Sequence, residues 1–220
     1  MFREIAAFAR SPEFNDRFRH ELRQLLRWRR DVRHFRTDPI DAATIDELLD
    51  LACLAPSVGN AQPWRFVSVD EPDNRAAIVA NFSAANEQAL GGYQGERAQL
   101  YASLKLAGLK EAPRHLAVFC DEETAQGAGL GRQTMPETLR YSVVIAVHTL
   151  WLAARTRGLG VGWVSILDPI AAAQALRVPK NWSLVAYLCL GWPAADHELP
   201  ELQRLGWQAR EATCRQVLQR

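Results

Sequence analysis

Cysteine is scarce in this 220-residue sequence, and the few thiols lie far apart. They form no CxxC motif, and no Cys/His cluster has the spacing of a zinc site, so we expect neither a bound metal nor a disulfide scaffold. Scattered, reduced thiols are typical of a cytoplasmic protein. The four cysteines are Cys53, Cys120, Cys189 and Cys214.

Long apolar runs are also missing. The most apolar stretch, 141–154, is interrupted by Ser142, His148 and Thr149, and it is shorter than the roughly 18 apolar residues that suggest a membrane span. Residues 1–14 mix acids with arginines and lack the apolar core of a signal peptide. We therefore expect no membrane association and no secretion.

The two signs of charge are nearly balanced, since the chain has 26 Lys and Arg residues and 25 Asp and Glu residues, which gives a net charge of +1. A balanced chain has no global field that would attract nucleic acid or an anionic membrane. The sequence also lacks the P-loop, HExxH and GxSxG motifs, and with them the usual machinery of nucleotide triphosphate chemistry and of metal- or serine-dependent hydrolysis. Any basic site must therefore be local.

Hydrophobic residues are plentiful, at 48% of the chain, which is enough for a substantial core in a single domain over residues 1–220. Strands separated by long helices indicate an α+β (mixed α/β) domain with a sheet flanked by helices. Periodicity and turn residues predict helices over 12–30, 44–55, 73–90, 95–111, 137–154 and 169–177, and strands over 65–70, 115–121, 161–166 and 183–191.

The helix expected over 137–154 is apolar on nearly every side, which is typical of a central or subunit-interface helix. His148 on this helix is most simply explained as a core histidine with its hydrogen bonds satisfied.

The densest charge lies in residues 27–36, which hold five arginines around Asp31. A solvated basic face would explain them, whereas a nucleic-acid patch is disfavoured because no second basic run or aromatic repeat supports it. The functional interpretation is an anion site for a phosphorylated cofactor, since arginine grips phosphate with two parallel hydrogen bonds. Asp31 is then either a salt-bridge partner or a proton carrier beside the ligand, and the sequence leaves both open.

Two other segments have ordinary and functional interpretations. The loop over 55–66 is either simple turn chemistry or a set of hydroxyl and amide groups for a heteroaromatic ring, from Ser57, Asn60 and Gln62. The glycines of 158–162 follow a helix and precede a strand, which is the wrong context for a dinucleotide fingerprint. We expect them to let the backbone approach a flat ligand, with Trp163 and Ser165 following on the strand.

Together these segments resemble a known family. PSVGNAQPWRF, at 56–66, resembles the loop-to-strand segment of nitroreductase-like flavoproteins, and LAARTRGLGVGWVSILDP, at 152–169, resembles their later flavin-side segment. The further combination of RRDVRHFRTDPI and LKLAGLKEAPRHLAVFCD is similar to the dimethylbenzimidazole synthase branch. The resemblance runs from Arg27 to Trp192.

The resemblance implies a mainly antiparallel sheet in a homodimer, with flavin sites at the subunit interface. It implies that reduced FMN is consumed as a substrate and, with molecular oxygen as co-substrate, is fragmented to 5,6-dimethylbenzimidazole and D-erythrose 4-phosphate. A separate NAD(P)H flavin reductase would supply the reduced FMN. The alternatives are an FMN-dependent NAD(P)H nitroreductase or quinone reductase that keeps its flavin, and a non-catalytic binder of flavin or nucleic acid.

Site residues are carried over from the matching motifs. Asp31 becomes the catalytic carboxylate, which moves protons, and Ser165 becomes the serine that hydrogen-bonds the flavin near its reactive ring. The positions that match flavin contacts are Arg29, Arg30, Asp31, Val32, Arg33, Ser57, Leu106 and Ser165.

Overall fold

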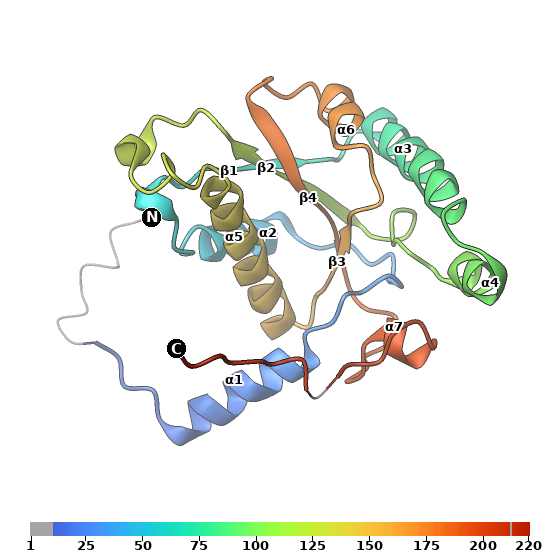
Figure 1. The fold of residues 1–220 in the computed structure, drawn as a ribbon, viewed down its shortest axis with the longest axis horizontal. Coiled ribbons are helices and arrows are strands. Elements are labelled where there is room, and N and C mark those ends of the chain that lie inside the picture. The colour runs from blue at the N-terminus through green and yellow to red at the C-terminus, as the bar shows by residue number, and fades with distance from the viewer. Residues whose placement is uncertain (1–10, 212) are drawn as a thin grey trace.

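The computed structural model describes residues 11–211 and 213–220, and its ribbon is shown in Figure 1. Most of the first segment, where we expect no signal peptide, lies outside the described residues. Within the described part of the chain, no helix is long and apolar enough to cross a membrane.

A four-stranded sheet forms the centre of the molecule, and every pairing in it is antiparallel. Its order is β1 (Trp64–Ser68), β2 (Arg114–Asp121), β4 (Trp182–Gly191) and β3 (Gly160–Val164). The expected antiparallel sheet and α+β class are confirmed. All four strands lie within a residue or two of their predicted bounds.

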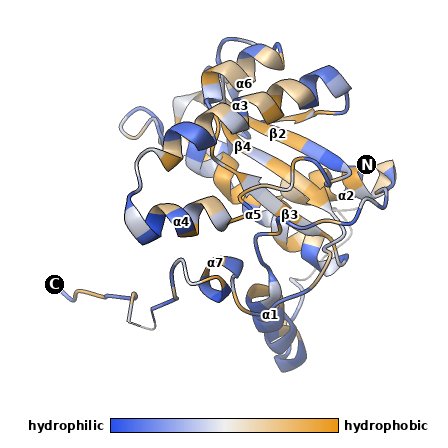
Figure 2. Ribbon diagram, turned by 90° about the vertical axis from the view of Figure 1, so that its right-hand side faces the viewer, coloured by the Kyte–Doolittle hydropathy of each residue, from blue (hydrophilic) through white to orange (hydrophobic). Residues whose placement is uncertain are grey.

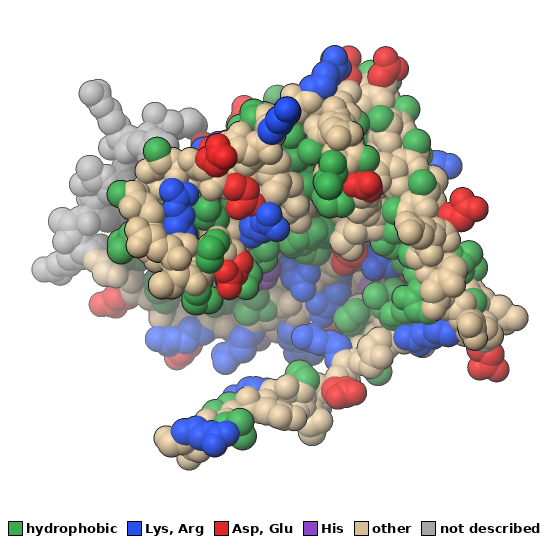
Figure 3. Space-filling model, turned by 45° about the horizontal axis from the view of Figure 1, so that its top comes forward, with side chains coloured by type: hydrophobic (Ala, Val, Ile, Leu, Met, Phe, Trp, Pro, Cys, Tyr) green, Lys and Arg blue, Asp and Glu red, His purple; other side chains and the backbone are tan. Residues whose placement is uncertain are grey.

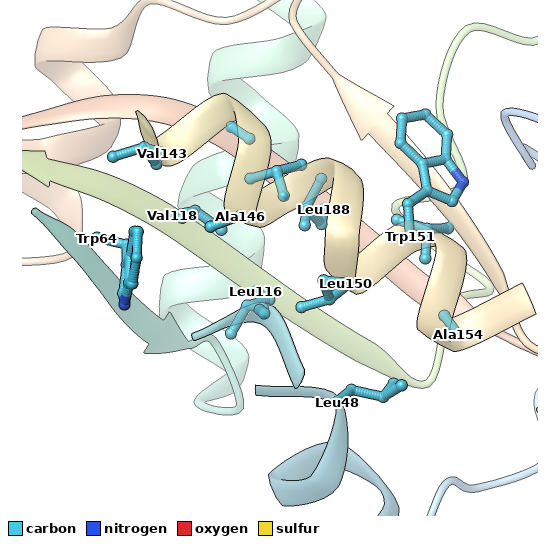
Figure 4. Packing of buried hydrophobic residues seen from close by; sticks show 14 of the residues in the cluster. Leu48, Trp64, Leu116, Val118, Val143, Ala146, Leu150, Trp151, Ala154 and Leu188 are labelled. Atoms are coloured by element: carbon cyan, nitrogen blue, oxygen red, sulfur yellow. The ribbon is translucent and has the colours of Figure 1, made fainter. Parts of the chain in front are cut away.

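Helices cover both faces of the sheet (Figures 1 and 2). One face packs against α2 (Ala42–Ala52) and α5 (Thr138–Thr156), and the other against α3 (Pro72–Leu90) and α6 (Pro169–Ala175). Because strand side chains alternate in direction, neighbouring residues of β2 enter different cores. Leu116 and Val118 point to the α5 side (Figure 4), whereas Ala117 and Phe119 point to the α3 side.

Helix α5 is buried against the sheet on one side and exposed on the other. Val143, Ala146 and Leu150 are buried against the sheet (Figure 4). Its outer face leaves Tyr141 and Ile145 53% and 42% exposed, so an apolar stripe faces outward. His148 also lies on the exposed side, and its assignment as a core histidine is wrong.

Helix α4 (Gly95–Ser103) is shorter than predicted, because 104–111 is irregular. The helix ends where Leu104 takes up an extended conformation, and the irregular segment packs Gly108 so close to Phe35 that a Cβ on it would lie 2.3 Å from the ring. The remaining elements are α1 (Asp16–Trp28), α7 (Glu201–Arg204) and the short 3-10 turns η2 (Val58–Asn60) and η3 (Gln126–Gly129). Helix α7 had no counterpart in the sequence prediction.

A buried histidine makes the fold sensitive to acid. His115 is 1% exposed, and its Nδ1 lies 2.9 Å from the Tyr187 hydroxyl. Burial lowers the pKa of His115 from 6.5 to about 4, so between these values the unfolded chain binds a proton that the folded chain does not. This contribution leaves the free energy of unfolding unaffected above pH 6.5 and reduces it by about 2 kcal/mol at pH 5.

Urea unfolding at pH 7.5 and pH 5 measures this effect. In His115→Gln, which keeps a hydrogen-bonding side chain but does not titrate, we expect the loss of stability between the two pH values to be about 2 kcal/mol smaller than in the wild type. An equal loss in both proteins would contradict the assignment.

Candidate active site

A cleft with a volume of about 490 Å³ lies beside the start of β3, among the residues that the structure describes. Its walls are the segment 28–34, the start of β3, the C-terminal half of α5 and the segment 194–205. Figure 3 shows Lys and Arg side chains gathered in this region, above the C-terminal segment. Arg29, Arg30 and Arg33 therefore belong to a concave site, whereas Arg27 and Arg36 are exposed and lie outside its wall.

Two glycines of β3 bring the arginine segment against the sheet. Asp31 forms a parallel bridge with Val161, and the Val32 N–H donates to the Val161 carbonyl at 3.1 Å. A Cβ on Gly162 would lie 2.2 Å from the Val32 carbonyl oxygen, and one on Gly160 would lie 2.7 Å from the Val32 side chain. We expected these glycines to admit a flat ligand; in this structure they admit the backbone that carries Asp31.

Asp31 is fixed by two donors from different parts of the chain. The Trp163 N–H donates to Oδ1 at 2.9 Å, and Arg33 Nε donates to Oδ2 at 2.8 Å. The side chain is 33% exposed and lies on the cleft wall. Burial raises the pKa of Asp31, and this effect outweighs the opposing effects of the Arg33 charge and the two hydrogen bonds. Asp31 is therefore a salt-bridge partner and also a carboxyl group with increased affinity for a proton.

The neighbouring arginines are held by main-chain and aromatic contacts. Arg30 Nε donates to the Glu198 carbonyl at 2.6 Å, and the Arg29 guanidinium lies 4.7 Å from the centre of the Trp151 ring. Burial lowers the pKa of Arg29 and of Arg30, although a guanidinium remains charged at neutral pH. Partly desolvated cations of this kind are suited to a doubly charged phosphate.

The cleft wall also contains basic residues that were not among the predicted site residues. Arg155 lies in the segment that resembles the flavoproteins and pairs with Asp196 at 2.5 Å. Arg204 belongs to the C-terminal part of the chain, where the resemblance is weak, so no motif identified it. The other basic residues on the wall are His34, Lys105 and His197.

Ser57 lies elsewhere in the fold. Its hydroxyl accepts from the Gln62 N–H at 3.0 Å, and the next residue, Val58, donates to Ser142 near the start of α5. The cleft lies beside Trp151, nine residues further along that helix or about 14 Å away along its axis. In one chain the described residues do not bring Ser57 to the arginines.

Leu106 and Ser165 lie next to residues that build the cleft. Leu106 is half-buried and follows Lys105, whose carbonyl accepts from Arg33 at 3.3 Å. Ser165 is exposed just beyond β3, two residues after Trp163. Neither belongs to the cleft wall among the described residues, so their roles remain predictions.

Helix α7 and the residues after it are tied to α4 by an aromatic cluster. The Arg97 guanidinium lies 3.7 Å from the centre of the Trp207 ring and also donates to the Trp207 carbonyl. Tyr93 stacks on Tyr101 and meets Trp207 edge-on. These contacts fix the cleft wall that α7 provides.

Among the described residues, no group of three or more His, Cys, Asp or Glu side chains is placed to hold a metal ion.

The sheet order, the helices on both faces and the basic cleft define the class of protein. Residues 26–192 match the Nitroreductase family, and the chain belongs to that family. The fold is shared with a crystal structure of oxidized iodotyrosine deiodinase bound to FMN and 3-iodo-L-tyrosine. The TM-score is 0.68 at 24% identity, over 90% of this chain and 97% of that one.

Two curated relatives place the chain more closely. A 5,6-dimethylbenzimidazole synthase of Rhodospirillum rubrum is 61% identical over 199 residues, which are 90% of this chain and 94% of the relative. A protein of the same name from Rhodobacter capsulatus is 53% identical over 195 residues, 89% of this chain and 94% of the relative. Within the nitroreductase family, the chain belongs to the dimethylbenzimidazole synthase branch.

Proposed function

We propose that this chain acts as an aerobic 5,6-dimethylbenzimidazole synthase, which fragments reduced FMN with molecular oxygen and also yields D-erythrose 4-phosphate. The observation that carries the proposal is Asp31: in a chain of this branch, a carboxyl group of raised pKa is held by two donors on the wall of a basic cleft. Electron transfer alone does not require such a group, whereas breaking carbon bonds requires protons to be moved.

The cleft fits FMN in size and in charge. Its volume of about 490 Å³ falls within the range of roughly 300–1,000 Å³ that is usual for small-molecule sites. Arg29 and Arg30 would hold the phosphate, and Val32 on the cleft wall would contact the ring system. When bound, reduced FMN supplies both the electrons for oxygen and the carbon skeleton of the product.

The chain's own groups then have distinct tasks. Asp31 exchanges a proton at its carboxylate oxygens, while Arg33 and the Trp163 N–H keep those oxygens in place and stabilise the ionised form. Ser165 offers a hydroxyl group from the end of β3.

A second copy of the chain would complete the site. Ser57 lies away from the arginines of its own chain, and the outer face of α5 exposes Tyr141 and Ile145. Exposed apolar patches of this kind mark interfaces. A further row of exposed apolar side chains runs along helix α1 and the chain just before it; it consists of Phe14, Phe18, Leu22 and Leu26.

We propose a homodimer in which Ser57 of one copy faces the cleft of the other. Sedimentation of the purified protein measures the mass of the assembly.

The proposed function also implies a cytoplasmic location and a separate supply of reduced FMN. The four cysteines are all free, which fits a reducing cytoplasm. A separate NAD(P)H flavin reductase would deliver FMN already reduced. The competing proposal is an FMN-dependent nitroreductase or quinone reductase that oxidises NAD(P)H and keeps its flavin.

One experiment separates these functions. The purified protein is mixed anaerobically with reduced FMN, oxygen is admitted, and the products are followed by chromatography and mass spectrometry. We expect 5,6-dimethylbenzimidazole in proportion to the flavin lost, and no NADH oxidation by the protein alone. Intact, reoxidised FMN together with NADH oxidation would favour the reductase.

A further inference from the structure

Trp151 is the residue of α5 against which the arginine segment packs. It is 9% exposed, and it belongs both to the core on that side of the sheet and to the cleft wall. Figure 4 shows its indole projecting from the helix in a different direction from Leu150, which is buried against the sheet. Trp151 therefore connects the hydrophobic core with the cleft.

Two contacts of different kinds hold the arginine segment on this residue. The Arg29 guanidinium lies over the indole, 4.7 Å from the ring centre. The indole Nε1–H donates to the Arg30 carbonyl at 3.2 Å. The ring is itself supported by Trp163 of β3, whose ring centre lies 6.4 Å away, within the usual range of aromatic pairs. Trp151 thus fixes the side chain of Arg29 and the backbone that follows it.

Arg29 differs from three other arginines of the cleft wall in what its guanidinium contacts. The side chains of Arg30, Arg33 and Arg155 each donate to a protein oxygen. Among the residues that the structure describes, no protein oxygen accepts a hydrogen bond from the Arg29 side chain, whose contact is the indole face. Stacking occupies the flat face of a guanidinium and leaves the N–H groups at its edge for an acceptor. Arg29 is therefore a held cation with hydrogen-bond donors to offer an anion in the cleft.

We propose that Trp151 is a positioning residue for the phosphate of FMN: it stacks on Arg29, holds that guanidinium ready for the phosphate, and thereby makes the site prefer FMN to riboflavin, which has no phosphate. The inference rests on the proposed function. Arginine binds phosphate through two parallel hydrogen bonds, which requires a defined orientation of its plane. A side chain already held in place loses less entropy when the ligand binds.

The test compares the affinities of oxidised FMN and of riboflavin, measured by quenching of flavin fluorescence. Trp151→Leu removes the aromatic face and is expected to lower the affinity for FMN about 10-fold while leaving the affinity for riboflavin unchanged. Trp151→Phe keeps an aromatic face and should keep most of the preference. The control is Trp192→Leu, because the Trp192 indole also donates to a backbone carbonyl, that of Pro39, but lies outside the cleft wall. This control should keep the wild-type preference.

A double variant separates positioning of Arg29 from general support of the fold. Arg29→Gln should lose the preference for FMN, and adding Trp151→Leu to it should reduce the preference no further, because Trp151 acts through Arg29. An unchanged preference in Trp151→Leu, equal losses for both flavins, or a full further loss in the double variant would each overturn the inference. So would a loss in Trp151→Phe as large as in Trp151→Leu, since the ring face would then not matter.

Flavin binding and turnover fail separately. A wild-type protein that prefers FMN but forms no dimethylbenzimidazole would contradict the proposed function and leave the role of Trp151 in place. A wild-type protein that binds riboflavin as tightly as FMN would overturn the role of Trp151, while product formation would still decide the proposed function.

Discussion

Asp31→Asn is expected to abolish dimethylbenzimidazole formation, with a loss of at least about 100-fold, while FMN still binds. Asparagine has the same size, and its carbonyl can still accept from the Trp163 N–H, so the segment stays docked on β3. The amide cannot carry the exchangeable proton, and its NH₂ group cannot accept from Arg33. Product formation by chromatography and FMN binding by fluorescence quenching measure the two effects separately.

The matched control is Asp38→Asn. Asp38 lies seven residues further along and forms an exposed ion pair with Arg36, away from the cleft. This variant should make product at the wild-type rate, because an exposed pair contributes about 1 kcal/mol or less to stability. An Asp31→Asn protein that bound FMN and kept full activity would remove Asp31 from the mechanism.

Gly162→Ala is expected to lose both stability and FMN binding. Its Cβ would meet the Val32 carbonyl oxygen at 2.2 Å, a backbone atom that cannot rotate away. Either β3 or the arginine segment must therefore shift, and the hydrogen bond from the Trp163 N–H to Asp31 would be lost. Overpacking of this kind costs about 1–3 kcal/mol, and the loss of a buried partner adds to that.

Chemical unfolding and FMN titration of this variant measure the two losses. Gly92→Ala is the control, since its Cβ would lie 3.3 Å from the Ala89 carbonyl at a position of ordinary backbone conformation. We expect that control to differ from the wild type by less than about 1 kcal/mol. Wild-type stability and FMN affinity in Gly162→Ala would show that the close approach of Val32 is not required.

Local patterns predicted the elements well where burial alone determines them. The run HLAVFCD is apolar on both faces because β2 lies in the middle of the sheet, and its predicted bounds differ by one residue from 114–121. The pattern failed for 104–111, where helical spacing continues but the backbone is irregular and Gly108 packs against Phe35. That contact joins residues distant in sequence, which no local window contains.

For the site as well, local patterns predicted some of the residues and missed others. The RRDVR motif identified Asp31 but left its role as a salt-bridge partner open; in the structure the partner is Arg33, two residues away. It could not reveal the Trp163 N–H, because this donor reaches Asp31 only through the docking of the segment on β3. The role of Gly162 was misread for a similar reason, since spacing shows that a close approach is needed but not which group makes it.

The walls of the cleft combine residues from the N-terminal and the C-terminal parts of the chain. The pairs Arg27 with Glu198 and His34 with Glu201 span 171 and 167 positions. Closing such long loops costs entropy, and a high share of contacts of this range slows folding. During synthesis, the cleft cannot assemble until nearly the whole chain has left the ribosome. The cleft is therefore complete only in a chain that has been made and folded through residue 205.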